Sequence, residues 1–138
     1  NGLANNGKDT GSRAYVGVTW EKYAAAVLAA SASGPLNGVP IHTWSVNYAT
    51  KAQPISDTTL KDAIQFVAFA RSQLLVSNET EKKYHDHLHN GRWAEASEMM
   101  KIIIRSVQRK AGVNVDGVFG RETGAYMDNF GYRVYYNG

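Results

Sequence analysis

The spacing of apolar residues predicts a helix in the middle of the chain. Over residues 56–76, apolar side chains recur at three- and four-residue intervals, which is typical of a helix with one buried face. Ser56 or Thr58 can cap its first turn, because both side chains can accept a backbone N–H bond. The predicted buried stripe consists of Ile64, Val67, Ala68, Leu74 and Leu75.

Two more helices are predicted directly after it. Asn78 or Thr80 can cap a polar helix that stops near His89, with Gly91 as the C-terminal signal. The next helix runs from about Trp93 to Lys110. Its predicted buried side consists of Trp93, Ala96, Met100, Ile103, Ile104 and Val107.

The remaining segments are short or rich in turn residues. Thr19 can cap a helix from Trp20 to about Ala30, and residues 31–53 form a long connection with a short helix near Trp44. A short helix begins near Arg121 and ends near Asn129, and residues 132–136 are extended. The pattern therefore predicts a mainly α domain, α+β at most.

The composition of the chain limits its possible domain organisation, covalent links and partners. The 138 residues fit a single domain over 1–138, and the lack of cysteine excludes disulfides and thiolate metal sites. The net charge of +3 is mild, which does not call for a nucleic-acid partner but favours polyanions such as the bacterial wall. No apolar run approaches the roughly 18 residues that span a bilayer, so we expect no membrane insertion. Without an initiator Met, we expect a processed chain or part of a longer polypeptide.

The Gly-rich segment near the C-terminus predicts a tight structural turn. Asp116 and Gly117 favour a turn in which the glycine takes a positive φ. Gly120 allows a close backbone approach, and Arg121 or Thr123 opens the last helix. The apolar residues expected to pack on the preceding helix are Val115, Val118 and Phe119.

Two segments together resemble one enzyme family. Residues 108–123, QRKAGVNVDGVFGRET, are similar to the C-terminal part of the N-acetylmuramidases of glycoside hydrolase family 108. A similar turn occurs in small three-helix peptidoglycan-binding domains. Residues 5–19 resemble the opening of the same family, where Asp9, Gly11 and the Gly17-Val18-Thr19 sequence match its pattern. We therefore expect an active-site hairpin and first helix in residues 1–30, and a peptidoglycan-type helix-turn-helix in residues 92–130.

The resemblance implies a lysozyme-like domain that cleaves the β-1,4 bond between N-acetylmuramic acid and N-acetylglucosamine. Asp9 would be the second carboxylate, and Thr19 or Tyr15 would hold the water. Glycoside cleavage also needs a general acid, and the family's Glu falls directly before Asn1 in this register. Glu21 is the nearest carboxylate within the chain, although a first-turn helix position explains it as well. The resemblance implies no cofactor and no metal.

A non-catalytic relative of these enzymes is the alternative interpretation. The same segments are consistent with a peptidoglycan-binding domain or a structural module of a phage virion, in contact with other virion chains. The expected partner is peptidoglycan in both cases, and the expected location is a phage virion or a secreted or periplasmic one.

Two other groups of residues are candidates for binding. Trp44 and His42, in the loop-rich connection, are the predicted substrate-binding residues, whereas Trp93 is expected in the core. His85 and His89 share a helix face that could chelate a metal, but the polar flanks favour a solvated helix end.

Overall fold

In a computed structural model of the protein, the described residues are 39–136. The predicted hairpin, the helix over residues 20–30, and the positions Asp9, Tyr15, Thr19 and Glu21 lie outside them. Along the described chain the elements are β1 (Val39–His42), α3 (Thr43–Tyr48), α4 (Asp57–Ser72), α5 (Asn78–His89), α6 (Trp93–Ala111), α7 (Arg121–Asp128) and β2 (Tyr132–Tyr135). This part of the chain is a small domain with five helices and one two-stranded sheet, and its mainly helical character is as the apolar pattern predicts.

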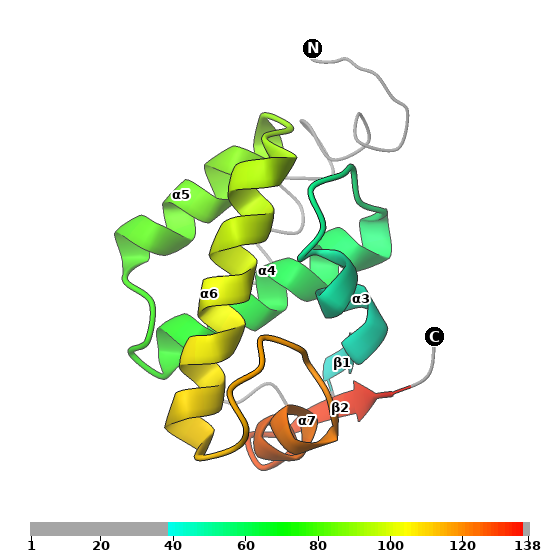
Figure 1. Ribbon diagram of the computed structural model, residues 1–138, viewed down its shortest axis with the longest axis vertical. Helices are drawn as coiled ribbons and strands as arrows, with labels where there is room; N and C mark the ends of the chain where they lie inside the picture. Colours follow the sequence, from blue (N-terminus) through cyan, green and yellow to red (C-terminus); the bar gives the residue numbers. More distant parts are fainter. Residues whose placement is uncertain (1–38, 137–138) are drawn as a thin grey trace.

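Helix α4 is the centre of the core. Its residues from Ala63 to Ala70 are all buried, because α3, α5 and α6 pack around it. In Figure 1, α5 and α6 run side by side and α4 crosses behind α6. The predicted stripe is correct for the residues inside the helix, but Leu74 is a correction. It lies beyond the end of α4 with a φ of 63° and is 92% exposed.

Serine side chains cap the N-termini of two helices, α4 and α5. Ser56 accepts a hydrogen bond from the backbone N of Thr59 at 3.2 Å, so it is the cap of α4. Ser77 accepts one from the backbone N of Thr80 at 3.0 Å. The expected caps Asn78 and Thr80 are therefore wrong, since Asn78 is already the first residue of the helix and Thr80 lies within it. Each serine satisfies an N–H group that has no partner within its helix.

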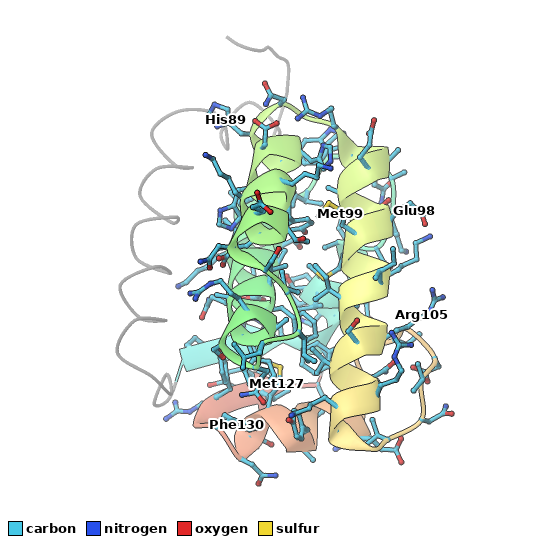
Figure 2. All side chains as sticks on the ribbon, turned by 90° about the vertical axis from the view of Figure 1, so that its left-hand side faces the viewer. His89, Glu98, Met99, Arg105, Met127 and Phe130 are labelled. Atoms are coloured by element: carbon cyan, nitrogen blue, oxygen red, sulfur yellow. The ribbon has the colours of Figure 1, made fainter. Side chains whose placement is uncertain are left out.

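Helix α6 carries the predicted apolar side into the core. Ala96, Met100, Ile103, Ile104 and Val107 are buried, whereas Trp93 is only partly buried. The helix ends at Gly112, whose φ of 74° favours glycine. Figure 2 shows Met127 and Phe130 at the end of the α5–α6 pair where α7 lies, with His89 at the opposite end.

The two strands join the ends of the described chain. β1 pairs with β2 in parallel, with Ile41 opposite Val134 and His42 opposite Tyr135. The sequence pattern predicts the extended tail correctly but misses β1, which it assigns to a long connection. Behind the sheet, Phe69 of α4 makes edge contacts with the rings of Tyr126, Phe130 and Tyr132.

A largely buried ion pair connects α4 with α5. Arg71 Nε lies 2.6 Å from Glu81 Oε1, and the two side chains are 23% and 5% exposed. Burial raises the pKa of Glu81 although Arg71 lowers it. On the same helix, burial and the Arg71 charge lower the pKa of His85 to about 4. His85 is therefore neutral in the folded chain down to mildly acid pH.

We predict that His85 makes the fold acid-sensitive. Between about pH 6.5 and 4 the unfolded chain binds a proton at this residue and the folded chain does not, so stability falls as the pH falls. A His85→Leu variant lacks about 3 kcal/mol of that fall in urea unfolding measured across this range. Leu88→Ala, a buried change on the same helix, lowers stability without altering the pH slope. Parallel pH curves for His85→Leu and the unmodified chain would contradict the prediction.

Candidate functional site

The turn after α6 is organised by one buried side chain, that of Gln108. Its amide nitrogen lies 2.9 Å from Asp116 Oδ1, 2.9 Å from the Val118 carbonyl oxygen and 3.1 Å from Thr123 Oγ1, so its two hydrogens are shared among three acceptors. Its amide oxygen accepts the backbone N–H groups of Asp116 at 3.1 Å and Gly117 at 2.9 Å. One glutamine thus fixes both sides of the turn and the first turn of α7.

A second amide holds the turn from the other side. Asn47, on α3, accepts the backbone N–H of Phe119 at 2.8 Å and donates to the Phe119 carbonyl at 3.0 Å. The Phe119 ring, 1% exposed, packs on Phe66 of α4 at a centroid distance of 5.4 Å. The turn therefore connects α3, α4, α6 and α7.

The predicted turn residues have structural roles, with one exception. Gly117 has a φ of 76°, and a Cβ there would lie 3.1 Å from Arg105 Nε. Asp116 accepts the Val118 backbone N–H, and this bond, with that from Gln108, lowers the pKa of Asp116. Gly120 is a correction, because no atom lies close to where its Cβ would be. It precedes α7, which begins at Arg121 rather than at Thr123.

The three apolar residues of the turn differ in how far they are buried. Phe119 is buried in the core, where it contacts Phe66 of α4, but Val115 and Val118 are 41% and 54% exposed. The prediction that these valines pack on α6 is therefore wrong. The polar bonds of Gln108 and Asn47, rather than burial of both valines, hold this segment in place.

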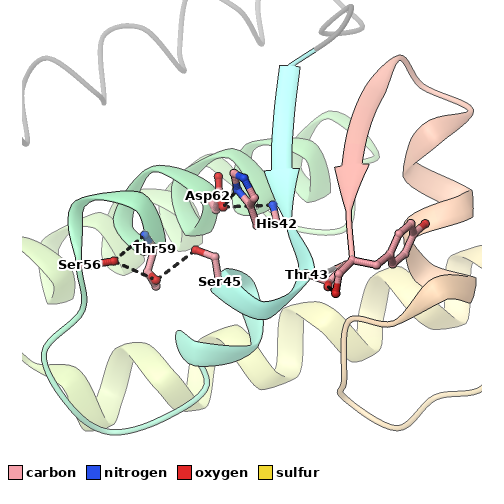
Figure 3. A network of polar contacts seen from close by, with 7 residues as sticks. His42, Thr43, Ser45, Ser56, Thr59 and Asp62 are labelled. Carbon is pink, nitrogen blue, oxygen red and sulfur yellow. Dashed lines mark hydrogen bonds and ion pairs between the residues drawn. The ribbon is translucent and has the colours of Figure 1, made fainter. Parts of the chain in front are cut away.

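The second cluster of polar groups lies at the end of β1. His42 is the last residue of the strand, and its backbone N–H and ring Nδ1 lie 3.1 and 2.9 Å from one oxygen, Oδ2 of Asp62 on α4. Figure 3 shows the two residues facing each other beside Ser45. The Asp62 side chain is 3% exposed and that of His42 is 30% exposed. The carboxylate is thus on the inside of the pair and the imidazole on the outside.

Burial is the main influence on the Asp62 carboxyl. It raises the pKa of Asp62, whereas the hydrogen bonds from His42 and Ser45 lower it, and the net direction is upward. Ser45 is fully buried, and its Oγ lies 3.1 Å from Thr59 Oγ1. It therefore lies on the inner side, out of reach of a bound substrate, and cannot act as a nucleophile with His42.

Aromatic rings surround the exposed side of His42. Tyr135, its partner across the sheet, stacks on the imidazole with a centroid distance of 5.2 Å and an angle of 20° between the planes. The Trp44 ring lies 5.7 Å away at 53°. Trp44 and Tyr135 are 39% and 41% exposed. The structure thus brings the predicted pair His42 and Trp44 together and adds Tyr135. Such a surface, with apolar rings and one polar group, is typical of ligand sites.

The short helix α3 connects the two clusters. His42 directly precedes it, and Asn47, near its end, binds the turn. Thr43, at its start, donates to the Tyr136 carbonyl at 3.3 Å. The Tyr136 ring in turn lies over Gly124, where any Cβ would overlap it, and 4.8 Å from the Arg121 guanidinium. The C-terminal strand is therefore positioned by α3 and α7 together.

The histidine-rich part of α5 lies apart from these clusters. Within residues 39–136, no group of three or more His, Asp or Glu side chains is placed to hold a metal ion. A hollow along α5 is lined by Glu79, Lys82, Lys83, His85, Asp86 and His89. Its polar, mixed-charge lining fits the predicted solvated helix end for all but His85, which is buried.

Sequence reasoning missed Asp62, which lies at the start of the buried part of α4. A single acidic residue among the apolar positions from Leu60 to Ala70 was the available signal, because a buried carboxylate requires a partner. Comparison with known proteins adds no assignment: no protein-family model, curated protein or solved structure matches this chain. No helix in the described part of the chain is long and apolar enough to cross a membrane.

We predict that Gln108 is a main determinant of stability. Gln108→Ala leaves two backbone N–H groups, the Val118 carbonyl and the Thr123 hydroxyl without their partner, which costs about 3 kcal/mol in urea unfolding. Arg109→Ala is the matched control, since this neighbour is exposed and changes stability by less than about 0.5 kcal/mol. Equal stability of the two variants would contradict the assigned role.

Proposed function

We propose that this chain is a peptidoglycan-acting domain of the muramidase type. The observation that carries the proposal is the Gln108 network. Gln108, Asp116, Gly117 and Thr123 are among the residues in which the chain resembles family 108 muramidases, and they meet in one set of hydrogen bonds. A chance similarity in sequence would not require its matching residues to bond to one another. The shared residues thus form a structural unit, which supports a common origin for that segment.

The candidate glycan-binding surface is formed by His42, Trp44 and Tyr135. Sugar rings present C–H faces that pack on aromatic side chains and hydroxyl groups that bond to a few polar atoms. Trp44 and Tyr135 supply exposed rings, and His42 supplies a polar ring edge between them. The net charge of +3 adds a mild attraction to the anionic bacterial wall.

Hydrolysis in this proposal belongs to residues outside the described part. By the resemblance, the general acid would be a Glu whose register falls directly before Asn1, where it would protonate the leaving oxygen. Asp9 acts as the second carboxylate, and Thr19 or Tyr15 positions the water. A lysozyme-like arrangement of the whole domain is part of the same proposal. The cleaved bond is the β-1,4 link between N-acetylmuramic acid and N-acetylglucosamine.

A second candidate is a non-catalytic peptidoglycan-binding or virion module of the same fold. It is favoured by the burial of Asp62 and Glu81, the carboxyl groups of the described residues with raised pKa values. A general acid needs such a pKa and also access to the substrate. Both side chains are at most 5% exposed, so neither can protonate a glycosidic oxygen. Among the described residues, the two carboxyl groups with raised pKa values are therefore out of reach of a glycan on the candidate surface.

One experiment with purified peptidoglycan separates these functions. The chain, and a longer polypeptide that includes the residue before Asn1, are incubated with peptidoglycan, and retained protein and released reducing ends are both measured. We expect both proteins to be retained and only the longer one to release sugar. Replacement of its Glu by Gln, or Asp9→Asn, lowers release by about a hundredfold or more.

Surface variants identify where the glycan binds. Trp44→Ala weakens retention about tenfold through loss of an exposed stacking ring. Ile102→Ala, which removes another exposed apolar side chain from α6, leaves it unchanged. Retention without sugar release by the longer protein would favour the non-catalytic module. Neither retention nor release would overturn both functions.

A further inference from the structure

The His42 ring is held at three points. Asp62 bonds to its Nδ1, its backbone N–H bonds to the same carboxylate oxygen, and Tyr135 stacks on one face. The backbone N–H can only donate, so Oδ2 of Asp62 is an acceptor. Where the Asp62 carboxyl is ionised, Oδ2 can only accept, so Nδ1 carries the ring hydrogen of the neutral imidazole and Nε2 keeps a lone pair.

The His42 side chain is partly open to solvent. Among the described residues no group bonds to Nε2, and the side chain is 30% exposed while Asp62 is 3% exposed. The edge lies beside two exposed aromatic rings, Trp44 and Tyr135. A fixed hydrogen-bond acceptor between apolar surfaces suits a ligand that has both a donor group and C–H faces.

We infer that Asp62 is a positioning residue, which holds His42 in one tautomer so that Nε2 accepts a hydrogen bond from an N-acetylated sugar seated on Trp44 and Tyr135. The donor on the ligand is a sugar hydroxyl or the acetamido N–H, both of which N-acetylglucosamine and N-acetylmuramic acid carry. This inference rests on the proposed function for its ligand, but the tautomer does not depend on that function.

The environment of Asp62 argues against a purely stabilising role. Burial raises its pKa despite the bonds from His42 and Ser45. A carboxyl group whose pKa is raised by folding contributes stability at low pH and loses that contribution as the pH rises through the folded value. The Asp62 carboxyl therefore contributes less to stability at neutral pH than at low pH. Groups kept in such a state are typical of functional sites.

The first test is the tautomer of His42 in the free protein. Nitrogen-15 NMR of the imidazole at neutral pH is expected to show Nδ1 protonated and Nε2 bare. In Asp62→Asn the amide can accept from Nδ1–H or donate to a bare Nδ1, so the signals should shift toward a mixture. An Nε2-protonated ring in the unmodified chain would overturn the inference whether or not the protein binds glycan.

The second test is a double-mutant cycle with a soluble tetramer of N-acetylglucosamine as the probe. Asp62→Asn and His42→Phe each weaken binding about tenfold, the effect of one hydrogen bond. Because Asp62 acts through His42, the double variant stays near tenfold. A product near a hundredfold, or full affinity in Asp62→Asn, would overturn the inference.

A control separates positioning from general loss of stability. Ser56→Ala removes the cap of the same helix without touching His42, so it lowers stability and leaves affinity unchanged. If Asp62→Asn does not fold, His42→Phe and the tautomer of the unmodified chain still decide the question. If the unmodified chain shows the expected tautomer but binds neither the tetramer nor peptidoglycan, the proposed function fails and the assigned ligand with it, while the tautomer assignment stands.

Discussion

The hydrogen bonds of Gln108 are the interaction on which the C-terminal half of the structure depends. A tight turn leaves backbone groups without partners, and burying them unpaired costs free energy comparable to a lost hydrogen bond. The Gln108 amide oxygen accepts two backbone N–H groups, and the two hydrogens of its amide nitrogen serve three acceptors. Its position on α6 makes the turn, and hence α7, an extension of the helical core.

The same turn also reaches the candidate binding surface through α3. Asn47 bonds both backbone groups of Phe119, so the turn and α3 are fixed relative to each other. His42 and Trp44 lie at the start of that helix, and Tyr135 reaches them through the parallel pairing of β1 with β2. A residue in the turn can therefore affect the ring cluster without contacting it, because rigid elements connect them.

Much of the helical fold follows from the sequence, because α4, α5 and α6 have a spacing or composition that a local pattern expresses. The predictions fail where the local structure depends on contacts with residues that are distant in the sequence. β1 is four residues long, contains Pro40, and pairs with a strand at the other end of the described chain, so no local turn signal announces it. Leu74 fits the helical spacing, yet the helix has already ended at Ser72.

The candidate site was likewise only partly predictable from the sequence. His42 and Trp44 could be named from their residue types and their loop-rich setting, but their partner could not. Asp62 lies twenty positions from His42 in sequence, and only the packing of α4 beneath β1 brings them together. Gln108 was part of the segment that resembles muramidases, although its role as the centre of the turn required the structure.

The most direct test of the proposed glycan-binding surface is a nitrogen-15 NMR titration of the chain with soluble disaccharide-peptide fragments of peptidoglycan. We expect the largest chemical-shift changes at the Trp44 indole, His42 and Tyr135, with weaker changes along α3. Shifts confined to the outer face of α5, or none in a folded chain, would contradict it.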